Sequence, residues 1–226
     1  MSILGRAALL LALAAAAYVV YAALRARRPG GRAWELSAER AVYAVTAFTT
    51  LAIGTMWVAL ATDAFELRNV AEYTSSTLEL QFKLTALWGS QAGSLLLWAW
   101  ILTIFAAIVV RTNRSRTRQL MPVVMAVLMG IAIFFLALLS FVTSPFETLA
   151  VVPEEGRGLN PLLQNPYMQI HPPLLYLGFV GLSVPFAFAI AALVTRKVDT
   201  AWIASVRRWT IFSWLFLGIG ILLGAK

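Results

Sequence analysis

Six apolar segments, each long enough to cross a bilayer as a helix, constrain this chain more than any other feature. Lipid cannot satisfy backbone N–H and C=O groups, so only helices and closed barrels span membranes. The alternating ten-residue segments of a barrel are absent. We therefore predict an all-α membrane bundle that forms one domain over residues 1–226. The predicted spans are Ile3–Leu24, Ala41–Ala61, Ser94–Val110, Met121–Val142, Leu174–Val194 and Trp209–Gly224.

The composition agrees with a membrane protein. The chain is 61% hydrophobic and 12% charged, whereas a soluble domain is about half apolar and about a quarter charged. A signal peptide carries its positive charge before the apolar core, but here the basic cluster follows the first span. The first span is therefore predicted to stay in the membrane. Because the chain has no cysteine, it forms no disulfide and offers no thiolate ligand.

The basic residues alternate with the crossings. Arginines crowd the first, third and fifth connections, whereas the second and fourth, residues 62–87 and 143–170, hold most of the acidic residues. The positive-inside rule explains this pattern and the net charge of +8, so no nucleic-acid partner is inferred. We predict a multi-pass protein of the plasma (inner) membrane, in contact with membrane lipid. Both termini and the two longer connections face outward.

The first outer connection contains a predicted interfacial helix. Ser76 and Glu79 form a capping-box pattern, and apolar residues then recur at helical spacing, which predicts a short amphipathic helix over Thr77–Trp88. Trp88 precedes two glycines four residues apart, Gly89 and Gly93. Such spacing is typical of close helix packing, and it also suits the lining of a ligand approach.

The second outer connection is rich in proline and leads to the only histidine, His171. Pro172 follows this residue and fits the first turn of a helix, so His171 is predicted at or just before the N-terminal cap of the fifth span. The positive end of the helix dipole would then favour a neutral imidazole, the form that binds metal.

A single histidine restricts the metals that the chain could bind. Zinc requires three or four nitrogen, sulfur or carboxylate ligands, and the sequence offers no second histidine and no cysteine. Haem iron requires only one or two axial ligands from protein. The alternative is that His171 is an ordinary polar residue at the headgroup level. The residues alone leave both interpretations open.

Three blocks of sequence resemble the N-terminal part of the CcmF family of cytochrome c-type biogenesis proteins, the membrane haem lyases. Residues Leu87–Trp98, LWGSQAGSLLLW, resemble the family's W-G-x-x-E-G-S-L-L-L-W. Residues Gly158–Tyr176 resemble G-L-N-P-L-L-Q-D-P-x-x-x-I-H-P-P-L-L-Y, and Gly178–Ala189 resemble G-Y-V-G-F-S-V-P-F-A-F-A. The resemblance covers essentially the whole chain.

The resemblance implies a function. Family members receive haem b outside the membrane from the haem chaperone CcmE and hold it between two external histidines, beneath a tryptophan-rich WWD loop. They then assist its covalent attachment to the CxxCH motif of apocytochrome c, which other proteins of the system deliver. His171 matches the first external histidine and is the expected haem axial ligand, while Trp88, Gly89 and Gly93 are expected to line the haem approach. No residue is assigned to catalysis.

The chain departs from the family pattern in three respects. Ala92 replaces the usual glutamate, Asn165 replaces the usual aspartate, and the sequence ends at Lys226, about where the WWD loop begins in the family. We therefore expect one part of a split or truncated haem lyase that is inactive alone and needs a second subunit or C-terminal part carrying the WWD loop. The alternatives are a non-catalytic scaffold or docking subunit of the complex, or a haem-transport component.

Overall fold

The computed structural model describes residues 1–113, 117–196 and 200–225, and helices account for most of them. The only β-type pairing among these residues is an isolated antiparallel bridge between Leu67 and Thr148. The predicted all-α class is confirmed. The elements are α1 (Ser2–Ala26), α2 (Arg32–Ala61), α3 (Arg68–Tyr73), α4 (Leu80–Thr85), the 3₁₀ helix η1 (Ala86–Gly89), α5 (Gln91–Asn113), α6 (Met121–Phe141), the 3₁₀ helix η2 (Pro161–Leu163), α7 (Pro166–Gly181), α8 (Ser183–Thr195) and α9 (Thr200–Gly224).

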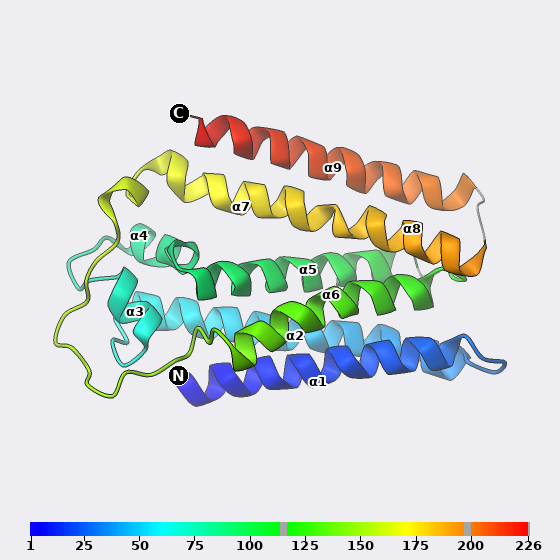
Figure 1. Cartoon of the computed structure of the whole chain (residues 1–226), viewed down its shortest axis with the longest axis horizontal. Helices are drawn as coiled ribbons and strands as arrows, with labels where there is room; N and C mark the ends of the chain where they lie inside the picture. Colours follow the sequence, from blue (N-terminus) through cyan, green and yellow to red (C-terminus); the bar gives the residue numbers. More distant parts are fainter. Residues whose placement is uncertain (114–116, 197–199, 226) are drawn as a thin grey trace.

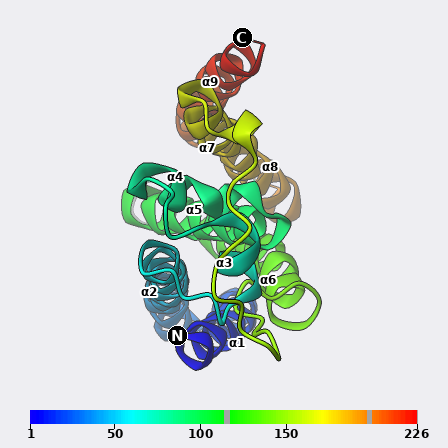
Figure 2. The same ribbon diagram turned by 90° about the vertical axis from the view of Figure 1, so that its left-hand side faces the viewer.

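The long helices run side by side along the molecule, with both chain ends at the same end of the bundle (Figure 1). Helices α1, α2, α5 and α6 pack as a four-helix unit. The α7–α8 rod packs beside this unit, and α9 lies outermost, mainly against α7 (Figure 2). The apolar core lies within the four-helix unit and includes Leu9, Ile53, Leu102 and Met125, all at most 1% exposed.

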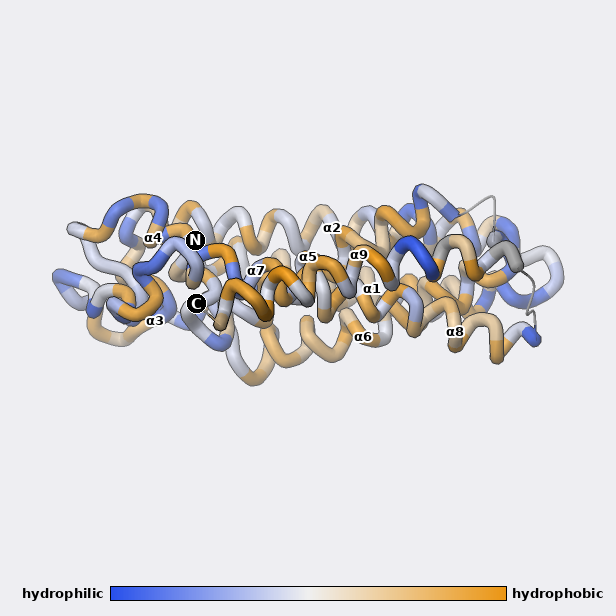
Figure 3. Tube along the Cα trace, turned by 90° about the horizontal axis from the view of Figure 1, so that it is seen from above, coloured by the Kyte–Doolittle hydropathy of each residue, from blue (hydrophilic) through white to orange (hydrophobic). Residues whose placement is uncertain are grey.

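Six helical segments are long and apolar enough to cross a membrane, which confirms the predicted number of spans. Hydrophobic residues fill the middle of the bundle, and hydrophilic residues gather at its two ends (Figure 3). One end carries the arginines of the short connections, among them Arg27, Arg28 and Arg118; we call it the basic end. The opposite end carries the two longer connections.

The second span begins nine residues before the predicted Ala41. Helix α2 starts at Arg32, so Glu35 and Glu39 lie inside it and are buried at the basic end. Arg32 and Arg118 pair with the Glu35 carboxylate at 2.8 and 3.3 Å. A buried carboxylate is tolerated when it is paired, and the pairing lets the helix continue beyond its apolar stretch.

The two longer connections fold together into what we call the outer cap, residues 62–90 and 142–165. Arg68 pairs with Glu147 at 3.2 Å, and the backbone N–H of Arg157 donates to the carbonyl of Ala71. Lys83 and Asp63 form a largely buried ion pair at 2.6 Å within the first outer connection, residues 62–87. The cap therefore joins residues that lie about eighty positions apart in the sequence.

The predicted capping box does not form. Helix α4 begins only at Leu80, after Glu79, and η1 follows it, so two short helices replace the single one predicted over Thr77–Trp88. The hydroxyl and backbone N–H of Ser76 instead donate to the carboxylate of Glu155, across the outer cap. A partner distant in sequence thus outcompetes the local cap.

The fifth span also begins earlier than the predicted Leu174. Helix α7 starts at Pro166, and the carboxamide oxygen of Asn165 caps it by accepting from the N–H of Tyr167 at 2.9 Å. His171 therefore lies in the second turn, and the prediction that it sits at the cap was wrong. The field of a helix terminus falls off beyond the first turn, so the expected effect of the dipole on the imidazole does not apply.

Candidate functional site at the outer end of helix α7

His171 lies where the first turns of α7 meet the last turns of α9. Its Nδ1 is 2.7 Å from the carbonyl oxygen of Gly220 on α9, and the side chain is half-buried. Figure 1 shows the start of α7 beside the C-terminal end of α9, at the same end of the bundle as the outer cap. The histidine is thus held between two helices near one surface of the membrane domain.

The bond to Gly220 determines which ring nitrogen can bind a ligand. A carbonyl oxygen only accepts hydrogen bonds, so Nδ1 must carry the proton and donate it. In the neutral ring, Nε2 then keeps its lone pair. A metal-binding histidine almost always donates its other N–H to a carbonyl, a carboxylate or water, which fixes the tautomer and orients the ring. The arrangement of His171 matches this pattern.

Small residues bring α7 and α9 close together in antiparallel register. A Cβ on Gly178 would lie 2.7 Å from the Cβ of Leu217, and one on Gly181 would overlap the hydroxyl of Ser213. Gly224 lies against the imidazole itself, because a Cβ there would overlap the ring and come within 2.7 Å of Nδ1. Gly224 therefore leaves the space that receives the imidazole, and Gly220 supplies the carbonyl oxygen that it contacts; we call these two glycines the notch.

Trp88 and Gly89 lie next to the start of α7. They line a cavity of about 30 Å³ together with Pro172, the residue after His171. Such a volume accommodates about one water molecule, so it cannot enclose a porphyrin. Two leucines of the second outer connection cover Gly89. A Cβ on Gly89 would lie 3.3 Å from Leu159 Cδ1 and 3.6 Å from Leu163 Cδ1. A role of Trp88 and Gly89 in a haem approach stays a prediction.

Gly93 is buried in the first turn of α5. A Cβ at this position would overlap the carbonyl oxygen of Leu87, and the N–H of Gly93 donates a hydrogen bond to the Ser90 hydroxyl oxygen at 2.9 Å. Close backbone packing therefore explains this glycine. Its expected contact with haem also stays a prediction.

Exposed apolar side chains lie on the segment that leads to His171. Ile170 precedes it and is 54% exposed, while Tyr167, one turn earlier on the same face of α7, is 43% exposed. Leu162 in η2 is 79% exposed. These exposed apolar side chains precede His171 in η2 and in the first turns of α7.

The ligands available within the described parts of the chain do not form a multidentate metal site. No group of three or more histidine, cysteine, aspartate or glutamate side chains lies together there. A metal bound at His171 must therefore bring most of its ligands with it. Haem iron does so, because the porphyrin supplies four nitrogens and the protein only the axial ligands. The donor set at His171 fits haem.

The sequence did not predict Gly220 and Gly224 as parts of the site. They lie about fifty residues after His171, and a glycine pattern in a membrane helix ordinarily indicates packing alone. Their spacing of four residues was the only available signal. Without the pairing of α7 with α9, it could not be connected to the histidine.

Comparison with known proteins identifies the family of this chain and several of its relatives. Residues 88–226 match the family model described as cytochrome C assembly protein. The chain is 41% identical over 223 residues to CcmF of Pseudomonas fluorescens and 39% identical over 221 residues to ccl1 of Rhodobacter capsulatus, both named as cytochrome c-type biogenesis proteins. Each alignment covers 98% of this chain but 34% of the relative, so the chain spans about a third of the length of these proteins.

The fold also has a solved counterpart. The structure of a protein titled Cytochrome c Heme Lyase CcmF superposes with a TM-score of 0.85 at 33% sequence identity, covering 97% of this chain and 34% of that one. The family match includes α5 to α9, and therefore His171 and both glycines of its notch. The chain belongs to the cytochrome c assembly protein family.

Proposed function

We propose that this chain holds haem at the outer face of the membrane during cytochrome c maturation, with His171 Nε2 as an axial ligand to the iron. The observation that carries the proposal is the bond from Nδ1–H of His171 to the Gly220 carbonyl, which leaves Nε2 available. The family match and the CcmF relatives support haem as the ligand. Haem b is the form expected before covalent attachment.

Haem is the substrate of this process. In the attachment reaction, the thiol of a CxxCH cysteine adds across a haem vinyl group: a C–S bond forms, the vinyl π bond breaks, and the thiol proton ends on the neighbouring carbon. The task of this chain is to hold and orient the substrate from one side. His171 supplies the ligand, α9 fixes its ring, and Tyr167 and Ile170 offer apolar surface. No residue of the chain is assigned to the addition step.

The proposal places the site outside the cytoplasm. The arginines gather at the basic end, and the outer cap contains Asp63, Glu147 and Glu155. By the positive-inside rule, the basic end faces the cytoplasm of an inner membrane, and the outer cap, His171 and both termini face the opposite side. CcmE as haem donor, apocytochrome c as acceptor, and a further chain that carries a WWD loop and a second ligand are part of the same proposal.

A second candidate is a docking subunit that holds no haem itself. Helix α9 favours it, because only 11% of its spanning window is buried within the chain. Trp214 and Leu222 on this helix are 74% and 71% exposed. Membrane helices also expose such residues to lipid, so this surface suits either a partner or the bilayer.

The test compares haem retention in the wild-type chain and in His171→Ala, both purified from cells that make haem. We expect the wild type to retain haem and the variant to lose most of it, because the iron loses its protein ligand. Gln169→Ala, two residues earlier on α7, is the matched control and should retain wild-type haem. Adding imidazole to His171→Gly should restore the haem spectrum if the ligand alone is missing.

The outcomes separate the candidates. Equal haem in the wild type and His171→Ala, with the same absorption spectrum and reduction potential, would reject the axial role. Haem in neither protein, alone or with a WWD-carrying partner, would support the docking subunit instead. Haem bound only in the presence of that partner would support the proposed function as a shared site.

A further inference from the structure

A pocket at the basic end of the bundle lies between α5 and α9, far from His171. Its volume is about 390 Å³. Three aromatic rings form its inner part: Phe105 on α5 lies 4.9 Å from Trp209 and 5.7 Å from Phe212 on α9, measured between ring centroids. Helix α9 makes most of its contacts with α7, so this aromatic cluster is its link to α5.

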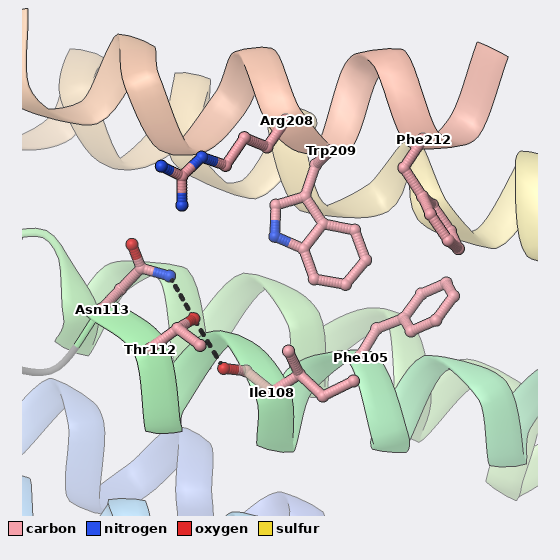
Figure 4. A pocket seen from close by; sticks show the side chains of 7 residues that line it. All are labelled: Phe105, Ile108, Thr112, Asn113, Arg208, Trp209 and Phe212. Carbon is pink, nitrogen blue, oxygen red and sulfur yellow. Dashed lines mark hydrogen bonds between the residues drawn. The ribbon is translucent and has the colours of Figure 1, made fainter. Parts of the chain in front are cut away.

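The two ends of the pocket differ in polarity. Figure 4 shows Arg208 and Asn113 at one end and the rings of Phe105 and Phe212 at the other. Asn113 is the last residue of α5, at the basic end of the bundle. The pocket thus has a cationic, polar mouth at the membrane surface and an apolar interior that extends toward the bilayer centre.

Arg208 lacks a counter-ion in the described structure. It lies eight residues inside α9, and among residues 1–113, 117–196 and 200–225 it makes no ion pair or hydrogen bond. The described parts of α5, α8 and α9 contain no acidic residue. The planar fork of an exposed guanidinium matches the oxygens of a phosphate, which it can bind through two hydrogen bonds.

We propose that this pocket binds an anionic phospholipid of the cytoplasmic leaflet. The phosphate accepts hydrogen bonds from the Arg208 guanidinium, and one acyl chain lies against Phe105, Trp209 and Phe212. Basic pockets between membrane helices on the cytoplasmic side are a known place for acidic lipid headgroups. The lipid would also fill the gap beside α9 and thereby brace the helix that positions His171.

The sixth span begins earlier than predicted. The predicted start at Trp209 leaves Arg207 and Arg208 in the connection before this span. The structure includes both in α9. Only Arg208 lines the pocket. Because both arginines are exposed and adjacent, Arg207 provides a control with the same charge and the same depth in the membrane.

The test is native mass spectrometry of the full chain in detergent, titrated with phosphatidylglycerol or phosphatidylcholine of the same acyl length. The wild type should bind phosphatidylglycerol more tightly. Arg208→Gln should weaken this binding about ten-fold, as expected for the loss of a hydrogen bond to a charged group. Arg207→Gln should leave it unchanged, and Arg208→Lys should restore part of it. Phe212→Ala should weaken the binding of both lipids.

Each other outcome overturns the proposal. Equal losses in Arg207→Gln and Arg208→Gln would indicate general charge attraction. Equal affinity of the wild type for the two lipids would remove the role of the phosphate charge. Complete displacement of phosphatidylglycerol by inorganic phosphate would indicate a plain anion site. Haem retention is read separately in the proposed-function test, so either proposal can fail without the other.

Discussion

At the scale of single residues, the site is one imidazole whose two nitrogens have different tasks. Nδ1 of His171 is committed to the Gly220 carbonyl, and Nε2 remains for a ligand. Gly224 also confines the ring, close to Cε1 and Nδ1. The sequence singles out the histidine, and its metal-binding role stays a prediction. The sequence could not predict the two glycines, because their function depends on the register between α7 and α9.

This confinement makes Gly224→Ala informative. The new methyl group would overlap the ring, and the ring cannot move away without losing its 2.7 Å bond to Gly220. We expect haem affinity to fall about ten-fold, as is typical when a residue that orients a metal ligand is lost. Because the chain has one histidine, ¹⁵N-histidine labelling gives the NMR signals of this imidazole alone. They should show Nδ1 protonated in the wild type and an altered bond in the variant.

Gly218→Ala is the matched control on the same helix. A Cβ at Gly218 would meet nothing within 4 Å, so the substitution should change neither haem affinity nor the imidazole signals. Equal effects of the two substitutions would mean that α9 responds as a whole, and the notch at Gly224 would then have no specific role.

At the scale of elements, hydropathy predicted which segments are helices but not where they end. The apolar runs identified all six spans, because lipid exposure dictates them. The ends depend on partners that hydropathy does not reveal. Arg32 and Arg118 pair with Glu35 and extend α2, the carboxamide of Asn165 starts α7 early, and Glu155 draws Ser76 away from the predicted cap.

The contact between Ser76 and Glu155 makes the outer cap sensitive to acid. The Ser76 hydroxyl, then the backbone N–H groups of Ser76 and Gly156, hold the pKa of the Glu155 carboxyl below its usual value of 4.5. A lowered pKa in the folded state means that the contact contributes stability above pH 4.5. This contribution is lost as the pH falls through the lower, folded-state pKa.

Amide hydrogen exchange at Ser76 and Gly156, corrected for the intrinsic rate at each pH, should measure this loss. We expect both amides to lose protection only below pH 4.5 in the wild type. Ser76→Ala removes the largest cause of the shift, so its loss of protection should begin at a higher pH. Thr77→Ala, at the next position, is a control. Protection that is independent of pH would show that the carboxylate does not hold the two connections together.

At the scale of the whole molecule, the bundle has two unlike ends. One holds the arginines of the short connections and the Arg208 pocket, and the other holds the folded outer cap and His171. The even number of spans brings both termini to the end with the cap (Figure 1). The charge pattern of the sequence predicted this polarity. The packing of the two long connections into one cap depends on contacts between distant residues and could not be predicted.

The central claim is that His171 Nε2 faces the extracytoplasmic side, where we propose that the chain holds haem. The chain contains no cysteine, so a single introduced cysteine reports its own side of the membrane. Leu162→Cys marks the exposed segment before His171, and Arg28→Cys marks the exposed turn at the basic end. In intact cells, a membrane-impermeant maleimide should label Leu162→Cys at once and Arg28→Cys only after permeabilisation. The reverse pattern would place His171 in the cytoplasm and contradict the account.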